Sequence, residues 1–117
     1  MTSNLPKISA VISVHNEEFQ LADCLGGLSF ADEIVVLLDK CTDGSESIAR
    51  NFTDCIVFGA WEKEGSRRNA GIEACTGEWV FEVDADERVP NALGKEIRSV
   101  VETSSADWHE IPVDNYV

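Results

Sequence analysis

The chain has 117 residues, of which 44% are hydrophobic and 26% charged, and only three are prolines, so its composition is that of a folded globular protein and excludes a disordered chain. We expect residues 1–117 to form a single small domain. Nine Lys and Arg against 22 Asp and Glu give a formal net charge of −13, which excludes a nucleic-acid-binding surface, because phosphate neutralisation needs clusters of basic residues.

The first predicted element is a strand over the β-branched run Ile8–Val14. Asn16 is expected to cap the helix that follows, which begins near Glu17 and carries leucines at helical spacing. The second strand is predicted over 34–38. The run 8–14 is far too short for a membrane span and leads into the polar sequence His-Asn-Glu-Glu, so it is not a signal peptide either.

The second half of the chain continues the alternation of helices and strands. A turn at Asp43 leads into a short helix, and residues 55–58 form the third predicted strand. A helix beginning at Gly65 precedes the fourth strand, over 79–83. The last helix follows Pro90, a residue that the first turn of a helix tolerates. A fifth strand is predicted over Trp108–Val117.

This alternation predicts an α/β fold with right-handed crossovers and a mainly parallel sheet that has helices on both faces. A doubly wound, Rossmann-like sheet with strands in the order 3-2-1-4 places the first strand between the second and the fourth. The chain ends at Val117 without a closing helix, so we expect an N-terminal part of a longer protein. The four cysteines lack zinc-ligand spacing and a disulfide framework, which favours reduced thiols and a cytoplasmic location.

An acidic pair, Asp84 and Asp86, directly follows the fourth predicted strand. Residues two apart in an extended backbone point the same way, so these carboxylates can share one small volume and would need a cation there. Glu17 follows the first strand and Asp39 the second. In the order 3-2-1-4 these loops border one crevice at the carboxyl ends of the strands, which predicts a divalent-metal and substrate site.

Three other ligand motifs do not fit the chain. No G-x-G-x-x-G follows the first strand, and the segment around Gly65 lacks the glycine pattern and the lysine of a P-loop. Neither acidic loop is an EF-hand, because the twelfth positions hold Arg50 and Lys95 where a bidentate glutamate is needed.

Four segments occur in the order and spacing of a known family: Val14–Glu17, Leu38–Ser45, Gly65–Gly71 and Asp84–Asp86. Over essentially the whole chain they resemble family 2 of the glycosyltransferases, GT-A-fold enzymes that transfer a sugar from a nucleoside diphosphate to an acceptor with inversion. The sequence Asp-Ala-Asp-Glu-Arg-Val is similar to the branch that builds bacterial envelope and lipopolysaccharide-core glycans. The resemblance implies a nucleotide-sugar donor, typically a UDP-sugar, and a glycan or lipid-linked acceptor, with peripheral association at the inner face of the membrane left open.

The resemblance also implies roles for individual residues of the nucleotide-sugar site. His15 takes the place of an aromatic residue beside the base, and Glu17 lies toward the ribose. Asp39 accepts a hydrogen bond from the base edge. Arg68 faces the base or the diphosphate, and Asp84 reaches the ribose side.

A Mg²⁺ or Mn²⁺ ion is the implied cofactor, held by Asp86 together with Asp84 and bridging the diphosphate, whose departure it stabilises as a Lewis acid. The chain departs from the family pattern at Leu38, where the first aspartate of a pair is usual, and at Glu82, where an apolar residue is usual. The family's catalytic base comes from sequence beyond Val117. The resemblance therefore implies that this fragment binds a donor but transfers poorly or not at all.

Simpler explanations stay open for several of these residues. Glu17 can favour the positive end of a helix, Asp39 can start a turn, and Arg68 can pair with a nearby glutamate. His15 can merely end its strand. For the whole chain, the competing hypothesis is a non-enzymatic acidic α/β module that binds a metal or a partner protein. A nucleotidyltransferase would show a Gly-rich, basic loop after the first strand, and none is present.

Overall fold

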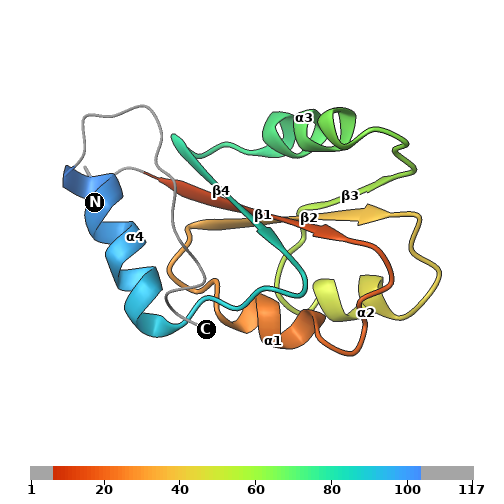
Figure 1. Ribbon diagram of the computed structural model, residues 1–117, viewed down its shortest axis with the longest axis horizontal. Helices are drawn as coiled ribbons and strands as arrows, with labels where there is room; N and C mark the ends of the chain where they lie inside the picture. The colour runs from red at the N-terminus through yellow and green to blue at the C-terminus, as the bar shows by residue number, and fades with distance from the viewer. Residues whose placement is uncertain (1–6, 104–117) are drawn as a thin grey trace.

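The computed structural model describes residues 7–103, in which strands and helices alternate as Figure 1 shows. The longest helix has 13 residues, and within this described part no helix is long and apolar enough to cross a lipid bilayer. The predicted strand over 108–117 lies outside the described residues. The elements are, in chain order, β1 (Ile8–Val14), α1 (Leu21–Gly26), β2 (Glu33–Asp39), α2 (Ser45–Ala49), β3 (Ile56–Gly59), α3 (Glu64–Ala74), β4 (Trp79–Asp84) and α4 (Asn91–Thr103).

The described strands form one parallel sheet in the order β3-β2-β1-β4, which confirms the predicted topology. In this sheet Val11 lies opposite Val35 on one side and opposite Glu82 on the other, and Ser13 lies opposite Asp84. Because the strands are parallel, all their carboxyl ends meet at the same edge. The loops after β1, β2 and β4 therefore start side by side.

Helices cover both faces of the sheet, as predicted. On one face Ile8, Ile12 and Val14 of β1 pack in the larger apolar cluster with buried residues of α1, α2 and α4. On the other face Val11 packs with Val35 and Leu37, and residues at the end of α3 join this smaller cluster. Among the helices of residues 7–103, Figure 1 shows α3 by itself on one side of the sheet, away from α1 and α2. The period-2 alternation of β1 thus serves two apolar layers at once.

Helix α3 approaches the sheet closely at Gly71. A Cβ atom at this position would lie 2.8 Å from Cγ1 of Val11 and 3.0 Å from Cδ1 of Leu37. Only glycine allows this spacing without a shift of the helix, because real Cβ atoms do not approach so near. The distance between α3 and the sheet therefore depends on Gly71, and α3 carries the arginines described below.

At the edge of the sheet where the strands begin, a hydrogen-bond network around Glu33 holds the amino ends of the strands together. Glu33 Oε1 accepts hydrogen bonds from Ser9 Oγ at 2.7 Å and Thr76 N at 2.8 Å, and Oε2 accepts one from Thr76 Oγ1 at 2.9 Å. Burial raises the pKa of Glu33, but these hydrogen bonds outweigh it and hold the pKa below its usual value. The network ties β1 and β2 to the turn before β4.

Candidate functional site

Asn16, the second residue after β1, joins two loops and does not cap a helix. Its backbone has a φ of 52°, in the left-handed region that asparagine tolerates, and α1 starts only at Leu21. The Asn16 Oδ1 atom accepts hydrogen bonds from Thr42 N at 2.7 Å and Asp43 N at 3.2 Å. The predicted cap was wrong because these two N–H groups of the neighbouring loop, distant in sequence, bind the side-chain oxygen instead.

Further contacts connect the same two loops. Glu17 N donates to Ser45 Oγ at 3.1 Å, and Gly44 N donates to Glu18 Oε2 at 2.8 Å. The half-buried Glu17 side chain stays within its own turn, because its Oε2 atom accepts a hydrogen bond from Gln20 Nε2. The loops after β1 and β2 thus form one hydrogen-bonded unit beside the carboxyl ends of the strands.

Asp39, the last residue of β2, is buried, with 7% of its surface exposed. Its Oδ1 atom accepts a hydrogen bond from Trp61 N at 3.1 Å, and its Oδ2 atom lies 3.5 Å from Arg67 Nη1. His15 Nδ1 lies 2.8 Å from the Asp39 carbonyl oxygen, and it must be the donor because a carbonyl only accepts. The structure therefore brings His15 and Asp39 together, and the carboxylate oxygens keep lone pairs for a further donor.

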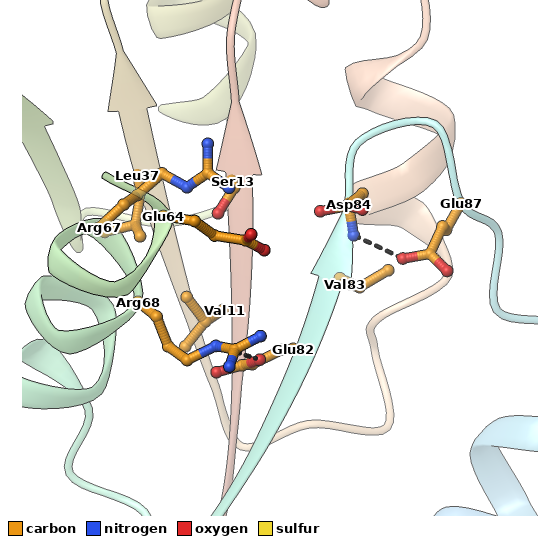
Figure 2. A pocket seen from close by; sticks show the side chains of 10 residues that line it. All are labelled: Val11, Ser13, Leu37, Glu64, Arg67, Arg68, Glu82, Val83, Asp84 and Glu87. Carbon is orange, nitrogen blue, oxygen red and sulfur yellow. Dashed lines mark hydrogen bonds and ion pairs between the residues drawn. The ribbon is translucent and has the colours of Figure 1, made fainter. Parts of the chain in front are cut away.

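Between α3 and β4 lies a cavity of about 180 Å³, which Figure 2 shows. Val11 and Ser13 of β1 and Leu37 of β2 contribute to its wall. Of the residues that the structure describes, four carboxylates and two guanidinium groups line it, and their summed charge is negative. The charged lining residues are Glu64, Arg67, Arg68, Glu82, Asp84 and Glu87.

The acidic pair after β4 does not lie on the extended backbone that the sequence predicted. The strand ends at Asp84, and a turn follows in which Glu87 N donates to Asp84 O at 2.9 Å and Asp84 N donates to Glu87 Oε1 at 2.8 Å. The alternation rule applies only to extended backbone, so it relates Asp84 to Glu82 and not to Asp86. Asp84 and Glu82 both line the cavity, whereas Asp86 is exposed in the turn.

Adjacent arginines on α3 have different partners. Arg68, the residue that the sequence singled out, forms an ion pair with Glu82 of β4, with 3.2 Å between Nε and Oε2. Arg67, for which the sequence predicted no role, contacts Asp39. Successive residues of a helix point about 100° apart, so only one of the two can face the end of β2. No local sequence signal distinguished them.

The residues present fit a divalent cation that is only partly bound by protein. Within residues 7–103, no three His, Cys, Asp or Glu side chains converge on a point where they could hold a metal by themselves. Asp84 and Asp86 offer exposed carboxylate oxygens, the ligand type that Mg²⁺ and Mn²⁺ prefer. Mg²⁺ typically takes one or two carboxylates and completes its shell with water and substrate phosphates.

The strand order of this doubly wound parallel sheet reverses between β1 and β4, which makes that place its topological switch point. Polar side chains lie there at the carboxyl ends of the strands. Such an arrangement is typical of a ligand-binding α/β protein. The chain belongs to family 2 of the glycosyltransferases. The family model described as "Glycosyl transferase family 2" matches residues 9–116, which is nearly the whole chain.

Curated and solved relatives agree with this assignment. The lipopolysaccharide core biosynthesis glycosyltransferase LpsC of Rhizobium meliloti is 32% identical over 98 residues, and the match covers 80% of this chain and 36% of LpsC. The structure of S. aureus TarS residues 1–349 has a TM-score of 0.65 at 25% identity, covering 81% of this chain and 32% of that one.

The structure of M. tuberculosis glucosyl-3-phosphoglycerate synthase has a TM-score of 0.71 at 22% identity, and the match covers 86% of this chain and 42% of the synthase. It shows that the two proteins share the fold. These structural likenesses confirm the predicted GT-A-like, Rossmann-like fold class. The chain thus spans about 36% of the length of the curated relative and less than half of each of these solved chains.

Proposed function

We propose that this chain is the donor-binding part of an inverting glycosyltransferase that uses a nucleoside-diphosphate sugar, most simply a UDP-sugar. One observation carries the proposal beyond family membership. Arg67 contacts Asp39 at the end of β2 and also lines the cavity that Asp84 of β4 borders. Arg67 therefore connects the Asp39 carboxylate of β2 with the cavity that Asp84 borders, at the edge of the sheet where such folds bind ligands.

In this proposal Asp39 recognises the base. Its carboxylate is held by Trp61 N and Arg67 and has lone pairs left to accept an N–H group of uracil. His15, held by its hydrogen bond to the Asp39 carbonyl, would lie beside the base, and Glu17 and Asp84 would lie toward the ribose. In support, the M. tuberculosis synthase has been solved with Mg²⁺ and UDP and with Mn²⁺ and UDP-glucose, and S. aureus TarS with UDP.

A divalent cation belongs to the same proposal. Asp84 and Asp86 would hold it beside the diphosphate, where it would supply Lewis-acid stabilisation of the leaving group. The four carboxylates and two guanidinium groups of the cavity leave a net negative charge, which disfavours a bare diphosphate. The cavity's own charge therefore supports the need for a cation.

The transfer itself would form a bond between an acceptor hydroxyl oxygen and the anomeric carbon while the bond from that carbon to the diphosphate oxygen breaks. The electron pair of the broken bond leaves with the nucleoside diphosphate, and the hydroxyl proton passes to an acidic base. We place this base and the acceptor site outside these 117 residues. The name of LpsC supports an acceptor in lipopolysaccharide core biosynthesis. We propose that a glycan or lipid-linked acceptor of this kind meets the enzyme in the cytoplasm, at the inner face of the membrane.

Calorimetric titration of UDP with and without Mn²⁺ tests the proposal. We expect Mn²⁺-dependent binding that weakens at least ~10-fold in Asp39→Asn, Asp84→Asn and Asp86→Asn, since each removes a charged ligand from the site. Asp54→Asn is the matched control, because Asp54 is exposed just before β3, at the opposite edge of the sheet. Binding of Mn²⁺ that is indifferent to UDP would support the non-enzymatic module instead.

A further inference from the structure

The ion pair between Arg68 and Glu82 lies farther from the carboxyl ends of the strands than Asp84 does. Glu82 is opposite Val11 in the sheet, two residues before the level at which Asp84 is opposite Ser13, so it lies farther from the carboxyl ends of the strands. Figure 2 shows Arg68 reaching from α3 to Glu82, away from Asp84 and Glu87. Glu82 therefore holds the Arg68 guanidinium farther from the carboxyl ends of the strands than the place where a diphosphate would bind.

Both arginines that line the cavity already have a carboxylate partner. Arg67 lies against the buried Asp39, and Arg68 lies against Glu82. The two pairs differ in exposure: the Arg67 and Asp39 side chains are 28% and 10% exposed, and those of Arg68 and Glu82 are 56% and 43% exposed. An exposed pair contributes little in water, so the Arg68 pair is the one that an incoming phosphate can break.

We propose that Glu82 limits the affinity of the site for diphosphate by competing for Arg68, and so favours release of the nucleoside-diphosphate product. The inference rests on the proposed function. Transfer of the sugar leaves a terminal phosphate with a second ionisation near pH 6, so the product carries more negative charge than the donor. A carboxylate in the cavity repels the product more strongly than the donor, and release of product often limits turnover.

The test measures how affinity depends on phosphate charge. Uridine, UMP and UDP are titrated calorimetrically, in the presence of Mn²⁺, into the wild type, Glu82→Gln, Arg68→Gln and the double variant. We expect Glu82→Gln to tighten UDP binding roughly three- to tenfold, UMP less, and uridine not at all, since the effect is Coulombic. In the Arg68→Gln background the same substitution should tighten UDP by less than it does in the wild type, because only the direct repulsion between Glu82 and the phosphates remains.

Glu102→Gln is the matched control, because it also removes a carboxylate from an arginine pair, with Arg98, on α4 and outside the cavity. It should leave UDP affinity unchanged. The inference is overturned if the wild type binds UDP and Glu82→Gln binds it no tighter, or if uridine and UDP tighten equally. If the wild type does not bind UDP at all, the proposed function fails and this inference fails with it.

Discussion

Replacing Gly71 by alanine tests whether the close approach of α3 to the sheet is built into the fold. The new Cβ would lie 2.8 Å from Cγ1 of Val11, a β-branched residue in the central strand β1. Val11 is buried and has little rotamer freedom, so either the helix or the strand must move. Gly65, in the first turn of the same helix, has nothing within 4 Å of its Cβ position and provides the matched control.

The two substitutions should have opposite signs. Alanine is favoured over glycine within a helix by about 1 kcal/mol, which both variants gain in part. Gly71→Ala also pays for overpacking, at about 1–3 kcal/mol, so its net effect is a loss of about 1 kcal/mol. Gly65→Ala should gain up to about 1 kcal/mol. The two variants should therefore differ by about 2 kcal/mol in free energy of unfolding.

Urea unfolding followed by tryptophan fluorescence measures this difference, and calorimetry with UDP measures its consequence for the site. A helix pushed away from the sheet carries Arg67 away from Asp39, so Gly71→Ala should also weaken UDP binding. If Gly71→Ala proves as stable as Gly65→Ala, the tight contact at Gly71 does not determine the position of α3 and the reasoning is refuted.

Three further predictions concern other parts of the chain. Asn16→Ala should lower stability by about 0.5–1.5 kcal/mol in urea unfolding, because the exposed N–H groups of Thr42 and Asp43 exchange the Asn16 oxygen for water. An unchanged midpoint would contradict the bridging role. The pKa of Glu33 is lower in the folded than in the unfolded chain. Its ionised carboxylate therefore stabilises the fold fully above about pH 4.3, and this stabilisation is lost as the pH falls through the folded pKa. On acidification the urea midpoint of Glu33→Gln should therefore fall less than that of the wild type. Burial raises the pKa of the Cys24 thiol to about 11. Iodoacetamide at about pH 8 should therefore modify Cys24 at least ~100-fold more slowly in the folded than in the unfolded chain. Peptide mass spectrometry measures the two rates, and equal rates would refute this prediction.

Asp39 shows what sequence reasoning could predict about the site. It follows a buried apolar run, and a parallel sheet in the order 3-2-1-4 necessarily brings the ends of its strands together, so its place at the crevice followed from pattern and topology. The relation between Asp84 and Asp86 could not be predicted in the same way. The relation between these two side chains depends on the residue at which β4 ends and a turn begins. The hydrogen bonds between Glu87 and Asp84 set the end of the strand at Asp84.

The sequence alone determined the alternation of strands and helices, because apolar residues at period 2 or 3.6 can be buried only in those conformations. Only the tertiary structure decided that Arg67 contacts Asp39 while Arg68 contacts Glu82, and that Asn16 joins the neighbouring loop instead of capping a helix. These contacts depend on the rotation of α3 about its axis and on which loops lie side by side. Both are set by packing between segments far apart in the chain, which no local pattern records.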